Sequence, residues 1–459
     1  MKGENSCANP VIIFCKCLLI LCLSLLALGI PVNVAASNAY GAIADWTQEQ
    51  KLVSQVWQIV NRSYYDPSFN HQNWYKVRKK FSAERSESRE ATYTLVEKML
   101  ATLDEPFTRL LRPDQYESMT TSTAGSLTGV GLQITVDPQF KSLVVITPIE
   151  GSPAEKAGVR SLDRIVAIDG TPTAGLTLDE CADKLRGEIN TEVILSILRP
   201  LVNTEIPPWE KPQIKENTDK ITDAEALNMP FETLELKLVR NTISVNPITA
   251  KLNQENQNLV GYIRLSQFNG NASSEMAKAI QKFESQGATG YVLDLRGNPG
   301  GLLQAGVEIA REWIPQGAIV YTLDRQGLQE SFEANNTALT KKPVVVLTDG
   351  GSASASEVLA GALHDNQRAS LLGTRTYGKG LVQSLYELED GSGLAVTIAR
   401  YETPNHTDIH KVGIKPDVEV RPTHSLNRGQ LGTFEDEQYV AAVKLLQTQV
   451  AAVKTEPSL

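Results

Sequence analysis

The stretch PVVVLTDGGSASASEVLAGALHD, from Pro343 to Asp365, joins a run of β-branched residues to a helical pattern through a turn of glycines and serines. The same rhythm recurs from Ile243 onward, where VGYIRLS precedes SSEMAKAIQKFESQG and GYVLDLRG precedes LLQAGVEIAREWI. Strands that alternate with helices in this way predict an α/β core with a largely parallel, buried sheet.

Three serines, Ser352, Ser354 and Ser356, lie where this strand meets its helix. In open α/β sheets, ligands bind beyond the carboxyl ends of the strands. Glycines allow a close backbone approach, and a helix N-terminus offers free N–H donors, which together can form an oxyanion hole. Two interpretations stay open from these residues alone, because a serine here can be a nucleophile or a helix cap.

A serine nucleophile needs a base, and the histidines do not supply one. His364 lies at the far end of the same helix, about 15 Å from its head, because each helical residue rises about 1.5 Å. Lys379, between glycines in GTRTYGKGLVQ, is the alternative. A lysine whose pKa is lowered by burial can accept a proton, although a lysine is more often a solvated surface residue.

The first 36 residues predict an export signal. The apolar run from Cys17 to Ile30 follows Lys2 and Lys16 and precedes small residues, so cleavage is expected after Ala36 or Ala39; a retained membrane anchor is the alternative. Four of the five cysteines lie in this segment, so the exported chain keeps a single cysteine and no internal disulfide. The net charge of −9 argues against nucleic acid as a partner.

Composition and pattern divide the rest of the chain. The predicted parts are a helical region over 46–119, a flexible joint over 119–129, a β-barrel-like domain over 126–240 with a long, disordered inserted loop at 200–231, the α/β core over 241–430, and a last helix and tail over 431–459. His406 and His410 lack a third ligand, so neither a metal nor another cofactor is expected.

Five ordered blocks resemble the signature of the carboxyl-terminal processing (tail-specific) serine proteases: GYIRLSQFN, DLRGNPGG, GSASASEVLAGALHD, GTRTYGKGLVQ and GIKPDVEV. The blocks VWQIVNRSYYDPSFN and DEPFTRLLRPDQYESM are similar to the cyanobacterial and chloroplast branch, which trims the photosystem II reaction-centre protein in the thylakoid lumen. The resemblance implies a crotonase-like protease core, a central PDZ domain, and a thylakoid-lumen or periplasmic location. A monomer is expected.

The resemblance also implies a role for each residue of a catalytic set: Ser354 as nucleophile, Lys379 as general base, Gln383 to orient the lysine from one helical turn beyond it, and the N–H groups of Gly300 and Ala355 as the oxyanion hole. Ser352 and Ser356 are then expected to cap the helix or adjust hydrogen bonds around the site. Asp365 matches an acidic position with a supporting role.

The segment GVGLQI, from Gly129 to Ile134, resembles the carboxylate-binding loop of PDZ domains. Its glycines expose N–H groups to a terminal carboxylate, and the strand after it can pair with a substrate tail. The expected tail-binding residues are Gly129, Gly131, Leu132, Ile134, Leu178 and Leu185. The alternative for the leucines is that they pack the core of the domain. The expected partners are proteins with apolar C-terminal tails, often membrane-bound precursors.

These observations predict a serine endopeptidase that cleaves near the C-terminus of exported proteins, including the photosystem II reaction-centre precursor. Three alternatives remain. One is a general periplasmic tail-specific protease. Another is a non-catalytic PDZ scaffold. The third is an acyl-CoA-processing enzyme on the crotonase-like core, which requires acidic catalytic residues and a cytoplasmic setting.

Overall fold

A computed structural model describes residues 35–455, apart from 138–141, 150, 201–230, 257, 328, 425 and 427–428. The chain divides into two compact units, Met1–Arg112 with Leu385–Val396, and Pro113–Ser384 with Thr397–Leu459. Nearly all of the predicted export signal and residues 201–230 of the predicted insertion lie outside the described residues. Within the part that the structure describes, we find no helix with the length and apolar character needed to cross a bilayer.

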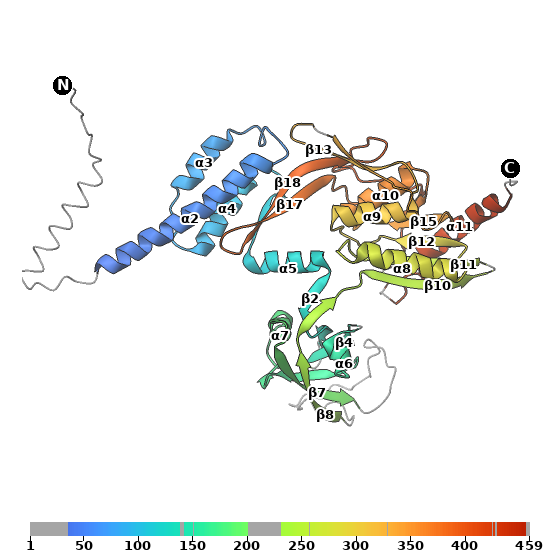
Figure 1. Cartoon of the computed structure of the whole chain (residues 1–459), viewed down its shortest axis with the longest axis horizontal. Coiled ribbons are helices and arrows are strands. Elements are labelled where there is room, and N and C mark those ends of the chain that lie inside the picture. The colour runs from blue at the N-terminus through green and yellow to red at the C-terminus, as the bar shows by residue number, and fades with distance from the viewer. Residues whose placement is uncertain are drawn as a thin grey trace, which may run out of the picture. The chain divides into compact units, whose positions relative to one another are not determined.

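The first unit is built on helices α2 (Ala35–Ser63), α3 (Trp74–Ala83) and α4 (Arg89–Ala101), with the short strand β1 (Arg109–Leu111) (Figure 1). Asn73 and Ser88 cap α3 and α4 by accepting a backbone N–H each. The helices bury apolar residues at helical spacing, among them Leu52, Val56, Val60, Leu95 and Met99.

The predicted flexible joint at 119–129 is wrong. Helix α5 (Pro113–Ala124) runs through its first half, and strand β2 (Ser126–Gly129) follows and pairs with β9 (Asn241–Ser244). Gly125, at φ +72, makes the turn between them. The serine and threonine content that favoured a joint is accommodated because the hydroxyls of Thr120 and Thr123 donate to carbonyls one turn earlier in the helix.

The predicted PDZ domain is a small antiparallel sheet with two short helices. Its sheet order is β3-β4-β5-β7-β8, with β6 beside β5. Helix α7 begins at the predicted capping box, because the Thr177 N–H donates to Glu180 and the Glu180 N–H donates back to the Thr177 hydroxyl. The elements are β3 (Leu132–Val136), β4 (Leu143–Pro148), α6 (Pro153–Lys156), β5 (Arg164–Ile168), β6 (Thr171–Pro172), α7 (Leu178–Leu185), β7 (Glu192–Pro200) and β8 (Phe231–Val239).

The α/β core has a sheet of order β10-β11-β12-β15-β16-β19, parallel from β11 to β19. A second sheet contains β13, β14, β17 and β18. The strands are β10 (Ile248–Glu255), β11 (Asn258–Leu265), β12 (Gly290–Asp294), β13 (Ala318–Asp324), β14 (Gln329–Glu333), β15 (Val344–Thr348), β16 (Ser370–Gly373), β17 (Leu381–Glu387), β18 (Gly393–Glu402) and β19 (Val418–Glu419). The expected α/β fold class is confirmed.

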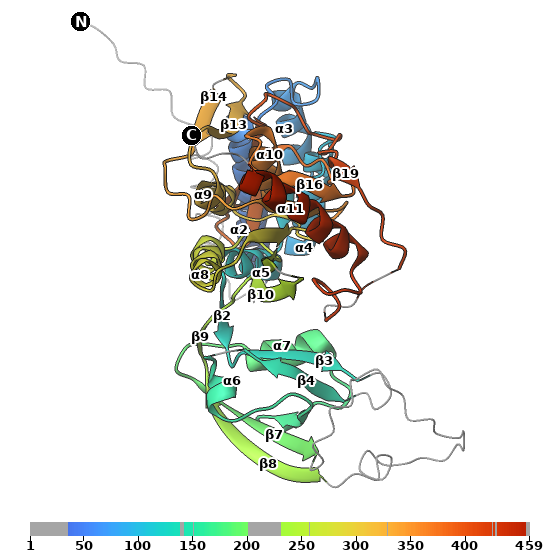
Figure 2. The ribbon, with the colours of Figure 1, turned by 90° about the vertical axis from the view of Figure 1, so that its right-hand side faces the viewer.

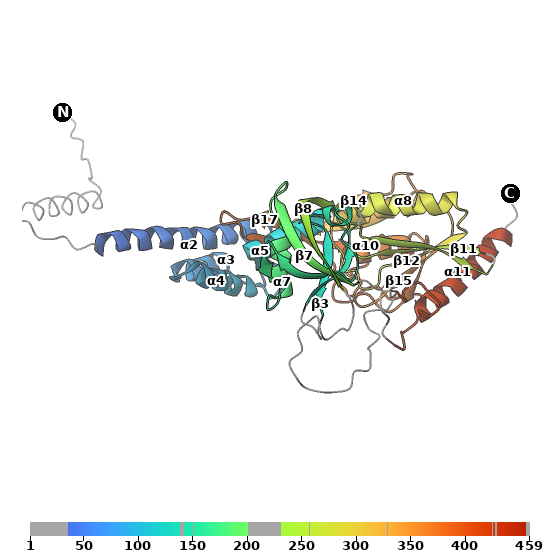
Figure 3. The ribbon, with the colours of Figure 1, turned by 90° about the horizontal axis from the view of Figure 1, so that it is seen from below.

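Helices cover both faces of the parallel sheet. Alternate residues of β12 point to opposite faces, so Leu293 packs with α8 (Ala272–Ser285), α9 (Leu303–Trp313) and α10 (Ala355–Asp365), while Val292 packs with α11 (Glu437–Thr455). Figures 2 and 3 show the core from two further directions, and Figure 3 shows β12 and β15 between α8 and α11. The sheet is therefore a rigid base, and its strands carry the loops that follow them.

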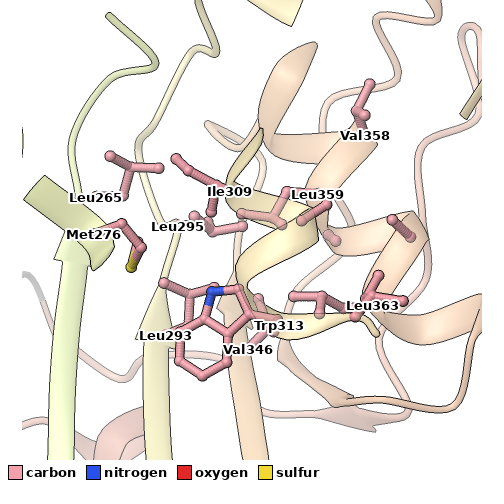
Figure 4. Close-up of a cluster of buried hydrophobic side chains, with 14 of the residues drawn as sticks. Leu265, Met276, Leu293, Leu295, Ile309, Trp313, Val346, Val358, Leu359 and Leu363 are labelled. Atoms are coloured by element: carbon pink, nitrogen blue, oxygen red, sulfur yellow. The ribbon is translucent and has the colours of Figure 1, made fainter. Parts of the chain in front are cut away.

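Trp313 lies in the buried apolar cluster between the parallel sheet and helices α8, α9 and α10, close to Leu293, Val346 and Leu363 (Figure 4). Trp313→Ala is expected to lower the free energy of unfolding of the core by about 3–5 kcal/mol, because it removes a buried aromatic side chain and leaves a cavity. Urea unfolding followed by circular dichroism measures this change. Phe434→Ala is the control, since Phe434 is 86% exposed. Equal losses of unfolding free energy in both variants would contradict the placement of Trp313 in the buried core.

Candidate active site

Ser354 lies in a strained turn between β15 and α10. Its φ of 56° and ψ of −117° fall outside the regions that most L-residues adopt, at a cost of about 1–3 kcal/mol. Helix α10 starts at the next residue, so Ser354 is the N-cap, and its side chain is half-buried. Strain of this kind persists only where surrounding contacts hold the backbone.

The fully buried carboxylate of Glu357 provides such contacts. It accepts the Ser354 N–H at 2.9 Å and the Lys379 N–H at 2.8 Å. It also accepts the Gly378 N–H at 2.7 Å and the Thr376 hydroxyl at 2.6 Å. One acidic side chain therefore holds the main chains of Ser354 and Lys379 together, although the two residues are distant in the sequence.

Tyr401, on β18, contacts the same two residues through their carbonyl groups. Its buried hydroxyl lies 2.7 Å from the Lys379 carbonyl oxygen and 3.0 Å from that of Ser354. Sequence reasoning missed both Glu357 and Tyr401. Glu357 is signalled by its position three residues after the N-cap, where a glutamate commonly returns to the cap N–H; nothing in the sequence near Tyr401 indicates its contacts.

The structure places Lys379 two residues before β17 and Gln383 within β17, both half-buried. The expectation that Gln383 lies one helical turn beyond the lysine is wrong, because this segment is a strand. The Gln383 amide donates to the Thr397 hydroxyl of β18 at 3.4 Å.

Gly300 and Ala355 lie side by side next to Ser354. A Cβ on Gly300 would be 2.8 Å from the Ser354 Cβ and 3.0 Å from the Ala355 nitrogen, so only glycine fits there. The Ala355 N–H has no hydrogen-bond acceptor among the residues that the structure describes. The Gly300 N–H donates to the Asn298 side-chain oxygen at 2.9 Å, so this donor is already occupied.

Ser352 and Ser356 do not cap α10. Their buried hydroxyls donate to the carbonyls of Leu295 at 2.8 Å and Asn298 at 2.9 Å, and the Ala353 N–H donates to Asn298 at 3.0 Å. The two serines therefore fix the loop that carries Gly300 against the turn that carries Ser354.

A buried ion-pair network holds the beginning of that loop. Arg296 binds Asp294 and also Asp436, the residue before α11. Burial alone would raise the pKa of Asp294, but hydrogen bonds from Arg296 and its positive charge outweigh burial and keep this pKa below its usual value. Both charges of the pair are therefore maintained at neutral pH, and the loop is held to the end of β12.

The predicted tail-binding residues of the PDZ domain separate into two groups. Leu185 is 5% exposed and belongs to the domain core, and Leu132 and Ile134 are partly buried against that core. Leu178, at the start of α7, is 39% exposed.

Gly129 pairs with Asn241 in β2–β9, and the Gly131 carbonyl accepts the Ile149 N–H. Among the described strands, β3 pairs only with β4, so its other edge, next to α7, is open.

The remaining polar candidates have structural contacts. Asp365 accepts the Asn405 N–H at 3.0 Å and contacts His364 at 2.9 Å. His406 stacks on Tyr321 with ring centroids 4.4 Å apart. No group of three His, Cys, Asp or Glu residues suited to a metal ion occurs within the described ranges.

Comparison with known proteins shows the family of the chain. The model of peptidase family S41 matches residues 259–420, and that of the PDZ domain matches residues 144–199. The chain is 50% identical to a carboxyl-terminal-processing protease of Synechocystis sp. over 92% of both chains. It is 40% identical to the chloroplastic C-terminal processing peptidase of Tetradesmus obliquus, over 82% of this chain and 78% of that one.

A solved structure is also similar. The photosystem II D1 C-terminal processing protease is 39% identical, with a TM-score of 0.50, and the match covers 82% of this chain and 94% of that one. A putative S41 protease from Bacteroides fragilis, 16% identical with a TM-score of 0.51, shares the fold.

Glu357→Gln is expected to slow the labelling of Ser354 by a fluorophosphonate about 10- to 100-fold. The amide has one acceptor oxygen, and its NH₂ group would face N–H donors, which leaves buried groups unpaired. Glu312→Gln is a matched control, because burial raises the pKa of Glu312 to about 8 and its neutral form resembles glutamine at pH 7. Equal labelling rates in wild type and Glu357→Gln would show that the carboxylate does not position Ser354.

Gly300→Ala is expected to reduce the labelling rate about 100-fold, because the new Cβ would displace Ser354 and distort the neighbouring N–H donors. Gly287→Ala controls for backbone strain alone, since Gly287 has φ +84 and nothing within 4 Å of the added carbon. If both variants react alike, the close approach of Gly300 to Ser354 has no functional consequence.

Proposed function

Because the chain belongs to peptidase family S41 and to its carboxyl-terminal-processing proteases, we propose that it cleaves exported proteins near their C-terminus with Ser354 as nucleophile and Lys379 as general base. The main support for these two roles is that the Glu357 carboxylate accepts the N–H groups of both residues, which brings Ser354 and Lys379 together. The close similarity to processing proteases makes the chain a serine-type peptidase, and a non-catalytic scaffold or an acyl-CoA enzyme no longer competes.

In the proposed mechanism, the neutral amine of Lys379 removes the proton of the Ser354 hydroxyl as its oxygen attacks the scissile carbonyl. The oxyanion receives the free Ala355 N–H and the Gly300 N–H, which exchanges its Asn298 acceptor for the stronger charged one. The protonated lysine then donates to the leaving amine, and water releases the acyl group. Gln383 is proposed to orient Lys379.

The PDZ domain is proposed to capture the substrate tail. Support comes from the open edge of β3, which can pair with an extended peptide, and from Leu178, which is exposed at the start of α7. The N–H groups of the loop from Gly129 to Gly131 would receive the terminal carboxylate. Capture of the tail raises the local concentration of the scissile bond at Ser354. Leu185 is proposed to support the pocket from the core rather than to line it.

The proposed substrates are precursors with apolar C-terminal tails, among them the photosystem II reaction-centre precursor, cleaved in the thylakoid lumen or periplasm by a monomer. The similarity to chloroplastic and cyanobacterial processing proteases supports this choice, as does the similarity to the photosystem II D1 processing protease.

The test is to incubate the protein with a precursor that bears the photosystem II tail and to follow the products by mass. Wild type should shorten the precursor, and Ser354→Ala and Lys379→Ala should be at least about 1,000-fold slower, because the nucleophile or its base is lost. Lys415→Ala removes an exposed lysine and should cleave normally.

Undiminished cleavage by the Ser354 variant would refute the catalytic assignment. Cleavage of other apolar tails, but not of this precursor, would instead identify a general tail-specific protease.

A further inference from the structure

Ser354 and Lys379 are each held through both their backbone N–H and their backbone carbonyl group. Glu357 accepts the N–H of both residues, at 2.9 and 2.8 Å. On the other side, the Tyr401 hydroxyl approaches the carbonyl oxygens of both, at 3.0 and 2.7 Å. A contact at the N–H side alone would leave each residue free to swing about that point, whereas contacts at both ends fix its orientation.

We propose that Tyr401 is a positioning residue whose hydroxyl sets the separation between Ser354 and Lys379. The proposal rests on the proposed function, because that function makes these two residues the nucleophile and the base. Tyr401 does not need to touch the substrate. It acts by holding the two main chains at one spacing, so that their side chains meet in the geometry that proton transfer requires.

The hydroxyl has a single proton for two carbonyl oxygens, and the contacts show where it goes. The Ser354 carbonyl already accepts the N–H groups of Glu357 at 2.8 Å and Val358 at 3.0 Å, in the first turn of α10. The Lys379 carbonyl lies closer to the phenol oxygen, so it receives the proton. The hydroxyl therefore binds the base segment strongly and rests against the start of the nucleophile helix.

Tyr401 is itself fixed by its surroundings. It is 2% exposed, its strand pairs with Thr322 of β13, and its N–H donates to the Gly380 carbonyl at 3.0 Å. Burial, with a further contribution from the Glu357 charge, raises the pKa of Tyr401 well above its ordinary value. The hydroxyl thus stays protonated at neutral pH.

Tyr401→Phe tests the proposal, because it removes the hydroxyl and keeps the ring. For cleavage of the tailed precursor, kcat is expected to fall about 100-fold, which is the cost of a small misplacement of reacting groups, while KM changes less than about two-fold. The shape of the pH profile should stay unchanged. Labelling of Ser354 by a fluorophosphonate should slow in parallel.

Tyr439→Phe is the matched control. Tyr439 lies in α11 and is 1% exposed. Its hydroxyl forms hydrogen bonds with Asn253 at 2.7 Å and Glu255 at 2.9 Å, both on β10. Both variants lose a buried hydroxyl with two contacts and keep the ring, so thermal unfolding should shift by similar amounts. Only Tyr401→Phe should lose kcat.

Four outcomes would overturn the proposal: an unchanged kcat, equal loss of kcat in both variants, a change confined to KM, or a loss beyond about 10,000-fold with an altered pH profile, which would make Tyr401 a catalytic residue. Failure of the proposed function is distinguishable from these outcomes, because wild type itself would then leave the precursor uncut.

Discussion

The site depends on one buried carboxylate. Taking the Glu357 charge out of water carries a large penalty unless hydrogen bonds replace the lost solvation. Four donors supply them, and two are the N–H groups of Ser354 and Lys379. The requirement to satisfy this charge therefore also brings the two functional segments together. It helps to offset the backbone strain of Ser354, because relaxing that residue would withdraw one of the four donors.

A second group of contacts links the turn that carries Ser354 to the loop that carries Gly300. Ser352 and Ser356 anchor the loop from the side of α10, and Arg296 anchors it from the side of α11. The loop is thus held by elements on both faces of the sheet. The three serines have separate positions as a result, since the outer two hold the loop and Ser354 is the N-cap residue of α10.

Much of this was predictable from the sequence, because strands, helices and the glycine turns that follow strands leave local patterns. The α/β core, the capping box at Thr177 and the cluster of motifs at the carboxyl ends of strands are of this kind. Contacts between distant segments leave no such pattern. Tyr401 stands in no motif of the sequence, and its contacts form only when folding brings its hydroxyl to the carbonyls of Ser354 and Lys379. The predicted joint at 119–129 failed because serine and threonine also fit a helix when their hydroxyls bond backward.

The Gly300 N–H must have a hydrogen-bond acceptor both with and without a bound oxyanion. In the structure it is satisfied by Asn298, whose own amide is fixed by donation to the Leu265 carbonyl at 2.9 Å. A buried donor left without an acceptor would be costly, so this pairing stabilises the loop when no oxyanion is present. An oxyanion carries a full charge and is a stronger acceptor than an amide oxygen. In the proposed mechanism, exchange of acceptors would therefore favour the transition state over the bound substrate, whose neutral carbonyl competes with Asn298 on nearly equal terms.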